Sequence, residues 1–357
     1  MTIILSNDDV ARLLTVPECM AALEEAYAEL AAGRGVNRQR SDTLAGIESR
    51  PDALYSLKSM DGIAPKFGVG AVRINSDVVT WPKRGNNQRR EKVPAAGGRW
   101  VGLVLLFSAE TGEPLAIFPD GVLQRMRVAS ANGIAAKYMA REDATRVGLL
   151  GCGWQAGTQL MAICAARRIE RIRCYSPTAE NRIAFAAEMT PQLRVEVEPV
   201  ASAEDAIAGA DVVMCATNSI DPVYFESWIV PGVHISSIKR PEIEQRALKR
   251  ADRLAIHTNE TKPLHFTTRD LEVPETAAGK GWQLVDDVDF TKLPTLPDLV
   301  AGRYRGRTKP EEVTAFINNI GMGYQFAAAG AVIYRKAREQ GVGHELPTEW
   351  FTEDVHP

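Results

Sequence analysis

The sequence predicts an α/β protein in which a Rossmann-type, doubly wound parallel sheet is joined to a separate α+β domain. Two observations lead to this prediction. Residues 146–257 alternate short apolar runs with helical patterns, as βαβ units do. Residues before about 120 instead show apolar runs separated by turn residues, which is typical of an antiparallel sheet. A chain of 357 residues is long enough for two such domains.

The first 120 residues predict two helices followed by strands. Ser6 and Asp9 form a capping-box pattern that opens a short helix, and an amphipathic helix runs from about Pro17 to Gly33. Later apolar runs predict strands, the last two joined by a hairpin turn, at 53–60, 66–74, 100–108 and 115–119. The polar, basic stretch 81–94 is interpreted as a loop. Its basic part, 83–92, is either a solvated excursion or a flap that brings positive charge near an acidic substrate.

A long helical pattern from Asp120 to about Ala140 connects this unit to the βαβ region. Six strands are predicted there, at 146–150, 171–175, 194–197, 211–216, 234–238 and 253–257. Helices are predicted between most of them, at 156–167, 179–189, 203–208 and 242–250.

The C-terminal part is expected to complete the first domain. Residues 293–309 read as a connection, 310–336 as helical, and the tail from Gly341 as irregular or wrapped around a neighbour. We expect the C-terminal helix to return onto the N-terminal unit. The predicted domains are therefore 1–125 with 318–357, and 126–317 for the Rossmann unit.

A glycine turn after the strand 146–150 predicts a nucleotide site. Gly151 and Gly153 follow this strand directly, and Ala156 occupies the third position of a dinucleotide-binding fingerprint. Gly151 would allow the tight turn, Gly153 would let phosphates approach the backbone, and Ala156 would let the helix pack close to the strand. This order directs backbone N–H groups and a positive helix end at a pyrophosphate. An ordinary strand–helix turn is the alternative interpretation.

Composition and charge argue against several other classes of protein. The net charge of −3 and a pI of about 6.1 give no sign of nucleic-acid binding. No apolar run reaches the ~18 residues of a membrane span, and the N-terminus does not read as a signal peptide. The 5 cysteines show neither a CxxC pair nor ligand-like spacing with His. We therefore expect a cytoplasmic protein with reduced cysteines and no metal site.

Four segments carry a more specific pattern. They are 103–116 with 118–121, 125–131, 151–156, and 210–218 with 228–235. Together they resemble the ornithine cyclodeaminase/mu-crystallin family. The resemblance implies a homodimer in which the N-terminal domain and C-terminal helix build the interface and the substrate pocket, while the central Rossmann domain binds NAD(H) or NADP(H). It also implies hydride transfer between the nicotinamide and an α-carbon, through an imine that bears a carboxylate.

The resemblance assigns catalytic roles to three basic residues. Arg40 and Arg127 would bind the substrate carboxylate, for which a guanidinium offers two parallel hydrogen bonds. Lys66 would be the acid–base group, with a pKa lowered toward neutrality in a closed site. Arg38 competes with Arg40 for its assignment. A salt-bridging Arg127, an exposed Arg40 and a surface Lys66 remain the alternatives.

On the cofactor side, strand ends and the glycine turn supply the expected contacts. The second strand is followed by Ser176, at a position where an NAD-specific site usually carries Asp or Glu. Ser176, Thr178 and Arg182 would instead hold a 2′-phosphate. This pattern favours NADP over NAD. The full set of expected cofactor-binding residues is Gly151, Gly153, Trp154, Gln155, Ala156, Ser176, Thr178, Arg182, Ala216, Thr217, Asn218, Ile238 and Lys239.

Two positions depart from the family pattern. Lys239 stands where cyclodeaminases carry a catalytic Asp, and Gln325 stands where relatives often carry Asp. Lys239 argues against a cyclodeaminase and weakly favours a dicarboxylate or other anionic substrate. The sequence therefore predicts an NAD(P)H-dependent oxidoreductase acting on C–N bonds of small imino or amino acids. A cyclodeaminase with recycled NAD, or a non-catalytic NADP-dependent binding protein like mu-crystallin, are the alternatives.

Overall fold

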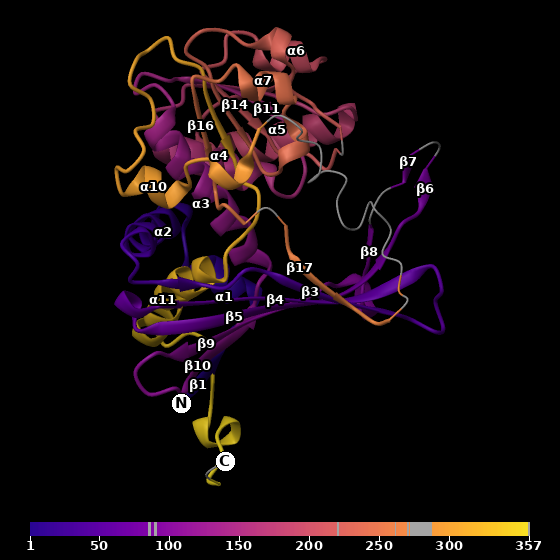
Figure 1. Ribbon diagram of the computed structural model, residues 1–357, viewed down its shortest axis with the longest axis vertical. Coiled ribbons are helices and arrows are strands. Elements are labelled where there is room, and N and C mark those ends of the chain that lie inside the picture. Colours follow the sequence, from indigo (N-terminus) through magenta and orange to yellow (C-terminus); the bar gives the residue numbers. More distant parts are fainter. Residues whose placement is uncertain are drawn as a thin grey trace.

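The computed structural model describes residues 1–84, 87–88, 91–219, 221–260, 262–269, 271 and 288–355. Two sheets organise the described chain, one in each half of the molecule, with helices between and around them (Figure 1). The predicted fold class, a doubly wound parallel sheet joined to an α+β unit, is confirmed.

The upper sheet is parallel throughout, in the order β13-β12-β11-β14-β15-β18-β16. In that order its strands are Val197–Pro199, Arg171–Tyr175, Arg146–Leu150, Val212–Cys215, His234–Ser237, Thr314–Ile317 and Arg253–Ile256. The three strands β14, β15 and β18 are buried along their whole length, as expected of strands covered on both faces. The chain leaves β11 to build strands on one side and returns to build β14 on the other, so a ligand site is expected at this reversal.

Helices cover both faces of this sheet. One face packs against α3 (Gly121–Met139), α4 (Ala156–Ala166) and α5 (Ala179–Leu193). The other packs against α6 (Ala203–Ile207) and α7 (Gln245–Lys249).

The helical prediction for 310–336 is wrong at its start. Thr314–Ile317 forms β18, between β15 and β16, and the helix α11 begins only at Gly323 (Gly323–Gln340). A short apolar run carries no periodicity that separates a buried strand from a buried helix, and this strand is inserted out of sequence order.

The lower sheet is mainly antiparallel, in the order β17-β3-β4-β5-β9-β10-β1-β19, with β2 added to β4 and β8 to β5. In chain order its strands are β1 Thr2–Ile4, β2 Val36–Asn37, β3 Ser41–Gly46, β4 Ala53–Ala64, β5 Val69–Thr80, β8 Glu91–Val93, β9 Val101–Ser108, β10 Pro114–Pro119, β17 Leu264–Thr267 and β19 His344–Leu346. The sequence predicted β4, β5, β9 and β10. It did not predict β1 and β3, or that the tail would pair with β1 as β19.

The basic stretch 81–94 contains short strands rather than a plain loop. Lys83–Arg84 (β6) pairs with Asn87–Gln88 (β7), and β8 pairs with β5. Residues 85, 86, 89 and 90, which belong to the predicted flap, lie outside the described residues.

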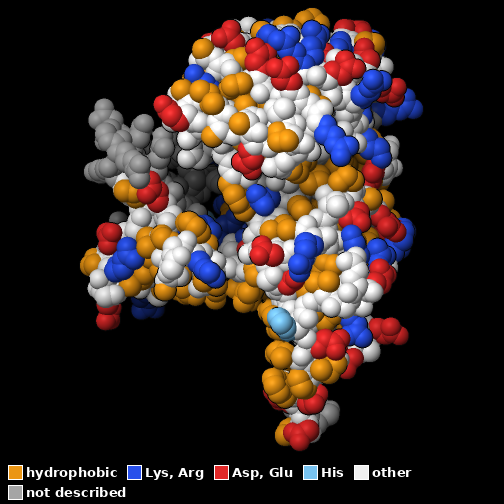
Figure 2. Space-filling model, turned by 180° about the vertical axis from the view of Figure 1, so that it is seen from behind, with side chains coloured by type: hydrophobic (Ala, Val, Ile, Leu, Met, Phe, Trp, Pro, Cys, Tyr) orange, Lys and Arg blue, Asp and Glu red, His pale blue; other side chains and the backbone are white. Residues whose placement is uncertain are grey.

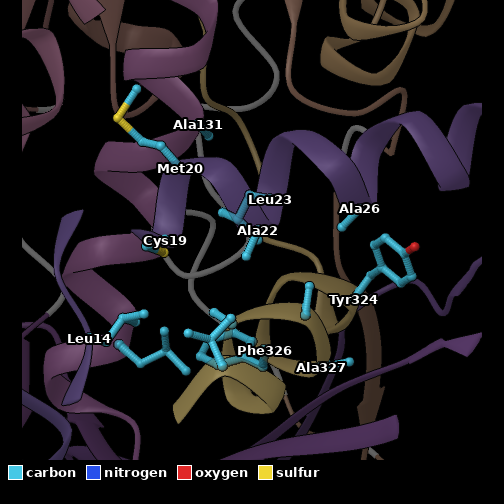
Figure 3. Packing of buried hydrophobic residues seen from close by; sticks show 14 of the residues in the cluster. Leu14, Cys19, Met20, Ala22, Leu23, Ala26, Ala131, Tyr324, Phe326 and Ala327 are labelled. Atoms are coloured by element: carbon cyan, nitrogen blue, oxygen red, sulfur yellow. The ribbon is translucent and has the colours of Figure 1, made fainter. Parts of the chain in front are cut away.

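The helices α2 (Val16–Ala31) and α11 fill the space between the two sheets, beside α1 (Asn7–Leu13) and α3 (Figure 1). Figure 3 shows Leu23 and Ala26 of α2 facing Tyr324 and Phe326 of α11. The first turn of α11 lies directly on β4, where a Cβ at Gly323 would collide with the backbone of Asp61. The predicted return of the C-terminal helix onto the N-terminal sheet is therefore confirmed.

The helices of the described chain include none with the length and apolar character of a membrane span. Within the same residues, no three His, Cys, Asp or Glu side chains gather as a metal-ligating group.

Candidate active site

A cavity of about 800 Å³ opens at the carboxyl edge of the parallel sheet, where β11, β12, β14 and β15 end. This size is typical of a small-molecule or cofactor site. Among the expected cofactor residues, those that line it are Gly151, Gly153, Trp154, Gln155, Ser176, Thr178, Ala216, Thr217, Asn218 and Ile238. Figure 2 shows a hollow between the two domains, with Lys or Arg side chains visible inside it.

The two glycines of the turn have different roles. Gly151 has a φ of +103°, and a Cβ there would collide with the carbonyl oxygen of Ala216 on the neighbouring strand. A Cβ at Gly153 would meet no atom within 4 Å, so the missing side chain of this residue keeps the cavity mouth open. Because α4 begins at Ala156, immediately after the turn, backbone N–H groups and the helix end suit a pyrophosphate.

Ala156, Arg182 and Lys239 are not among the residues that line the cavity. Ala156 is fully buried with Leu149, which is the close packing of helix on strand that the fingerprint predicts. The Arg182 Nη1 donates to the Ser176 carbonyl at 2.9 Å, and the guanidinium lies 5.7 Å from the Tyr175 ring centroid. Arg182 thus holds the turn after β12.

Arg127 lies in the N-terminal half of α3, near the same edge of the parallel sheet. The Asn318 Nδ2, just after β18, donates to the Val128 carbonyl at 2.9 Å, and the Ser236 hydroxyl of β15 donates to Asn132 Oδ1 at 3.0 Å. The Thr314 hydroxyl, at the start of β18, donates to the Met139 carbonyl at the other end of α3. The helix α3 therefore runs along the face of β15 and β18, and its turn at Arg127 lies near the carboxyl ends of these strands.

Among the described residues, no counter-ion pairs with the buried guanidinium of Arg127. Its Nη1 donates to Gln325 Oε1 at 3.2 Å, and its Nε has no hydrogen-bond partner among the described residues. Within the same part of the chain, no carboxylate forms an ion pair with it. Burial, and then the nearby charge of Arg73, lower the pKa of Arg127 to about 9. The site therefore presents a positive charge that an anionic ligand would complete.

Arg40, and not Arg38, belongs to this charged group. Arg40 donates from Nε and Nη2 to the two oxygens of Asp42, at 2.7 and 2.6 Å, and its charge acts on Arg127 and Arg73. Arg38 is more exposed and donates to Asp61 at 2.6 Å. Asp61 and Asp42 occupy opposite faces of the sheet, because neighbouring positions alternate along β4 and Asp42 is buried with the inner set.

The structure does not bring Lys66 to Arg40 and Arg127. Lys66 lies in a 3₁₀ turn, Pro65–Phe67, between β4 and β5, and is half exposed. Its ammonium pairs with Glu25 at 2.8 Å and Glu29 at 3.7 Å. The hydrogen bond to Glu25 raises the pKa of Lys66, which is opposite to the expected lowering. The predicted strand began at residue 66, whereas β5 begins at Val69.

Comparison with known proteins identifies the family. The model of the ornithine cyclodeaminase/mu-crystallin family matches residues 1–341. The chain belongs to this family. It is 27% identical over 349 residues to a Delta(1)-pyrroline-2-carboxylate reductase of Bacillus cereus, covering 96% of this chain and 99% of that protein.

Solved structures of this family share the whole fold. The Delta(1)-pyrroline-2-carboxylate reductase of Thermococcus litoralis, in complex with NADH and L-proline, matches with a TM-score of 0.76 at 26% identity, over 97% of this chain and 100% of that chain. An archaeal alanine dehydrogenase dimer with bound NAD matches with a TM-score of 0.75 at 25% identity, over 97% and 99% of the two chains.

Sequence reasoning missed a second buried arginine of this family member, Arg73 on β5. Its Nε donates to Asp120 Oδ2 at 2.6 Å, and Asn75 Nδ2 donates to the same oxygen at 3.2 Å. Arg73 and Arg127 both lie over the ring of Phe326, at 5.6 and 5.4 Å from its centroid. The sequence does contain a signal for this residue. Arg73 and Asn75 occupy alternate positions of a strand whose neighbouring positions face outward, so both should face the core.

A buried chain of hydrogen bonds orients Gln325 beneath Arg127. His257 Nδ1 lies 2.6 Å from the carbonyl oxygen of Ile320, which can only accept, so Nδ1 carries the proton. Nε2 then accepts from the Tyr27 hydroxyl at 2.8 Å, and this hydroxyl accepts from Gln325 Nε2 at 2.8 Å. Burial lowers the pKa of His257 to about 4, which keeps the ring neutral. Gln325 therefore turns its oxygen toward Arg127.

Gly153→Val should abolish cofactor binding while leaving the fold intact. The position is open, so the added side chain would extend into the cavity where the glycine turn meets the pyrophosphate. The measurement is fluorescence titration with NADPH and NADH, together with thermal unfolding. Gly46→Val, at an equally open position on β3, is the matched control and should bind normally. Normal cofactor affinity in Gly153→Val would remove the turn from the cofactor site.

Proposed function

We propose that this protein is an NAD(P)H-dependent oxidoreductase that reduces an imino acid or ketimine, or oxidises an amino acid at its α-carbon in the reverse direction. The main observation behind this proposal is that Arg127 is a buried cation without a carboxylate partner among the described residues. It lies near the same sheet edge as the cofactor cavity. A buried charge of this kind is costly until a counter-ion completes it. The carboxylate of the substrate would be that counter-ion.

In this proposal the residues divide into two groups. The glycine turn and the start of α4 hold the pyrophosphate, while Thr217, Asn218 and Ile238 bound the nicotinamide end of the cavity. Arg127 and Arg40 hold the substrate carboxylate, and Asp42 keeps the Arg40 guanidinium in one orientation. When bound, the cofactor supplies or accepts a hydride. The protein's contribution is to fix the α-carbon in front of it.

Reduction of an imine also requires a proton donor near the imine nitrogen. Lys66 is the candidate that family resemblance assigns, and its ion pair with Glu25 would have to break before its ammonium reached the substrate. Because Lys66 is half exposed, its position does not match that of a proton donor in an active site closed to water.

We further propose that the cavity accepts NADP(H). The hydroxyl-bearing residues Ser176 and Thr178 line it after β12, and among the described lining residues there is no Asp or Glu. A carboxylate at this position usually binds the ribose hydroxyls of NAD and would repel a 2′-phosphate. Because the reductase and the alanine dehydrogenase of known structure contain NADH and NAD, every assay should include both NADP(H) and NAD(H).

The purified protein should oxidise NADPH or NADH in the presence of a suitable substrate. The panel consists of 2-oxo acids with ammonia or methylamine, and preformed cyclic ketimines, which all present an imine beside a carboxylate. Loss of absorbance of the reduced cofactor is the measurement. Cofactor binding without oxidation would instead favour a cyclodeaminase or a binding protein. Ammonia release from ornithine, without net cofactor turnover, would separate these two.

Arg127→Met should lower kcat/KM by roughly 100-fold, because two charge-assisted hydrogen bonds to the carboxylate are worth about 3 kcal/mol or more. The cofactor Kd should stay within about twofold, since Arg127 is outside the cavity lining. Steady-state kinetics and cofactor titration provide both values.

Two further variants, each of which replaces another cation by Met, serve as comparisons for Arg127→Met. Arg38→Met removes an exposed guanidinium that pairs with Asp61 and should leave kcat/KM unchanged. Lys66→Met tests whether Lys66 acts in catalysis. If Lys66 forms only a surface ion pair, kcat/KM should change by less than about threefold. A loss as large as that of Arg127→Met would return Lys66 to the active site.

We propose that the protein is a homodimer joined through the outer face of the lower sheet, with the domain 1–125 and 318–357 forming the interface. Four apolar side chains lie together on this face, each between 38% and 43% exposed: Tyr55, Leu57, Val101 and Leu103. They flank β5, because β4 and β9 are its two neighbours. An exposed apolar patch of this kind is typical of a protein interface.

Leu57→Asp combined with Leu103→Asp should convert the dimer to a monomer, because each subunit would bury new charges in the interface. Light scattering after size exclusion gives the molar mass. Ile183→Asp, at a 57% exposed position on α5, is the control and should remain dimeric. A double variant that stays dimeric would place the interface on another face.

A further inference from the structure

One buried carboxylate joins two walls of the cofactor cavity. Glu242 ends the 3₁₀ turn Arg240–Glu242 and is fully buried. Its Oε1 accepts hydrogen bonds from the backbone N–H and the hydroxyl of Thr217, at 2.5 and 2.7 Å. Its Oε2 accepts from the Ile238 N–H at 3.0 Å. Thr217 follows β14 and Ile238 follows β15, so this carboxylate fixes the ends of two adjacent strands.

The environment of Glu242 makes its charge sensitive to pH. Burial raises the pKa of Glu242 to about 7, opposed by the hydrogen bonds from Thr217 and by the charge of Lys239. Burial, together with the charge of Glu242, raises the pKa of the Cys215 thiol on β14 well above its usual value. Burial likewise raises the pKa of Tyr224, in the connecting loop. Cys215 and Tyr224 therefore stay neutral near pH 7. The neighbouring carboxylate of Glu244 has a different partner, because it accepts a hydrogen bond from the Glu226 N–H.

We propose that Glu242 is a positioning residue that favours the oxidised form of the cofactor when ionised and loses this preference when protonated. The inference rests on the proposed cofactor site. The oxidised nicotinamide ring carries a positive charge and the reduced ring is neutral, so a carboxylate behind the cavity wall attracts only the oxidised form.

Protonation would also disturb the wall itself. The carboxylate accepts from two backbone N–H groups, which can only donate, and from the Thr217 hydroxyl, which can also accept. A protonated carboxyl would therefore reverse its hydrogen bond with this hydroxyl or weaken one of the bonds from the N–H groups.

The direction of the pH effect follows from the raised pKa. The folded protein holds the proton on Glu242 at pH values where an ordinary glutamate has already lost it, and releases it as the pH rises through about 7. Binding of the oxidised cofactor favours the ionised form. Affinity for the oxidised form should therefore increase relative to the reduced form between about pH 6 and about pH 8.5, and then level off.

The test is calorimetric titration of the full-length protein with NADP⁺ and NADPH, and with NAD⁺ and NADH, across this pH range. The ratio of the reduced-form Kd to the oxidised-form Kd should rise on the order of tenfold with pH. Using this ratio cancels the titration of the 2′-phosphate, which both forms of NADP carry. A ratio that does not change with pH would overturn the proposal.

Glu242→Gln preserves size and removes the charge. Its ratio should be about tenfold lower than wild type at about pH 8.5 and independent of pH. Glu244→Gln makes the same change two residues away and should keep the wild-type ratio and its pH dependence. A Glu242→Gln protein with the wild-type ratio would overturn the inference. If this variant does not fold, the wild-type pH series decides alone. Failure of the wild type to bind any cofactor would overturn the proposed function instead.

Discussion

The buried guanidinium of Arg127 is the constraint around which the two domains are arranged. It comes from the helix α3, contacts Gln325 of α11, and lies near the carboxyl end of β18 in the parallel sheet. A buried charge without a counter-ion is tolerated only where the surrounding structure fixes it. Here the hydrogen bonds from His257 through Tyr27 to Gln325 provide that support, and each member contributes a defined donor or acceptor.

This arrangement explains why α2 and α11 occupy the space between the sheets. Tyr27 belongs to α2, Gln325 to α11 and His257 to the end of β16, so the network links three elements that are distant in sequence. The same helices bury the apolar core that Figure 3 shows. Apolar burial supplies most of the stabilisation, whereas the polar network specifies how the helices are oriented.

The sequence predicted the parts of the fold that local patterns encode. The glycine turn, the long helix α3 and the first strands of the parallel sheet depend on spacing within short segments, and they lie where expected. The strand β18 was not predicted because its partners, β15 and β16, are separated from it along the chain. The local structure around Lys66 was not predicted, because the strand expected from residue 66 begins only at Val69 and Lys66 lies in the turn before it. Glu242 was not among the predicted site residues, because its hydrogen bonds to Thr217 and Ile238 depend on tertiary contacts.

The strand β5 links the site to the outer face of the sheet. Along it, Arg73, Asn75 and Asp77 are buried on the inner face, while Ile74 and Val78 point to the outer one. Side chains on a strand alternate strictly, so a shift of one residue in the pairing of β4, β5 and β9 would exchange the two sets. The charged residues would then reach the apolar patch, and apolar residues would enter the site beside Arg127. The register of one strand thus constrains the proposed substrate site and the proposed dimer surface together, and neither face can change its pattern independently of the other.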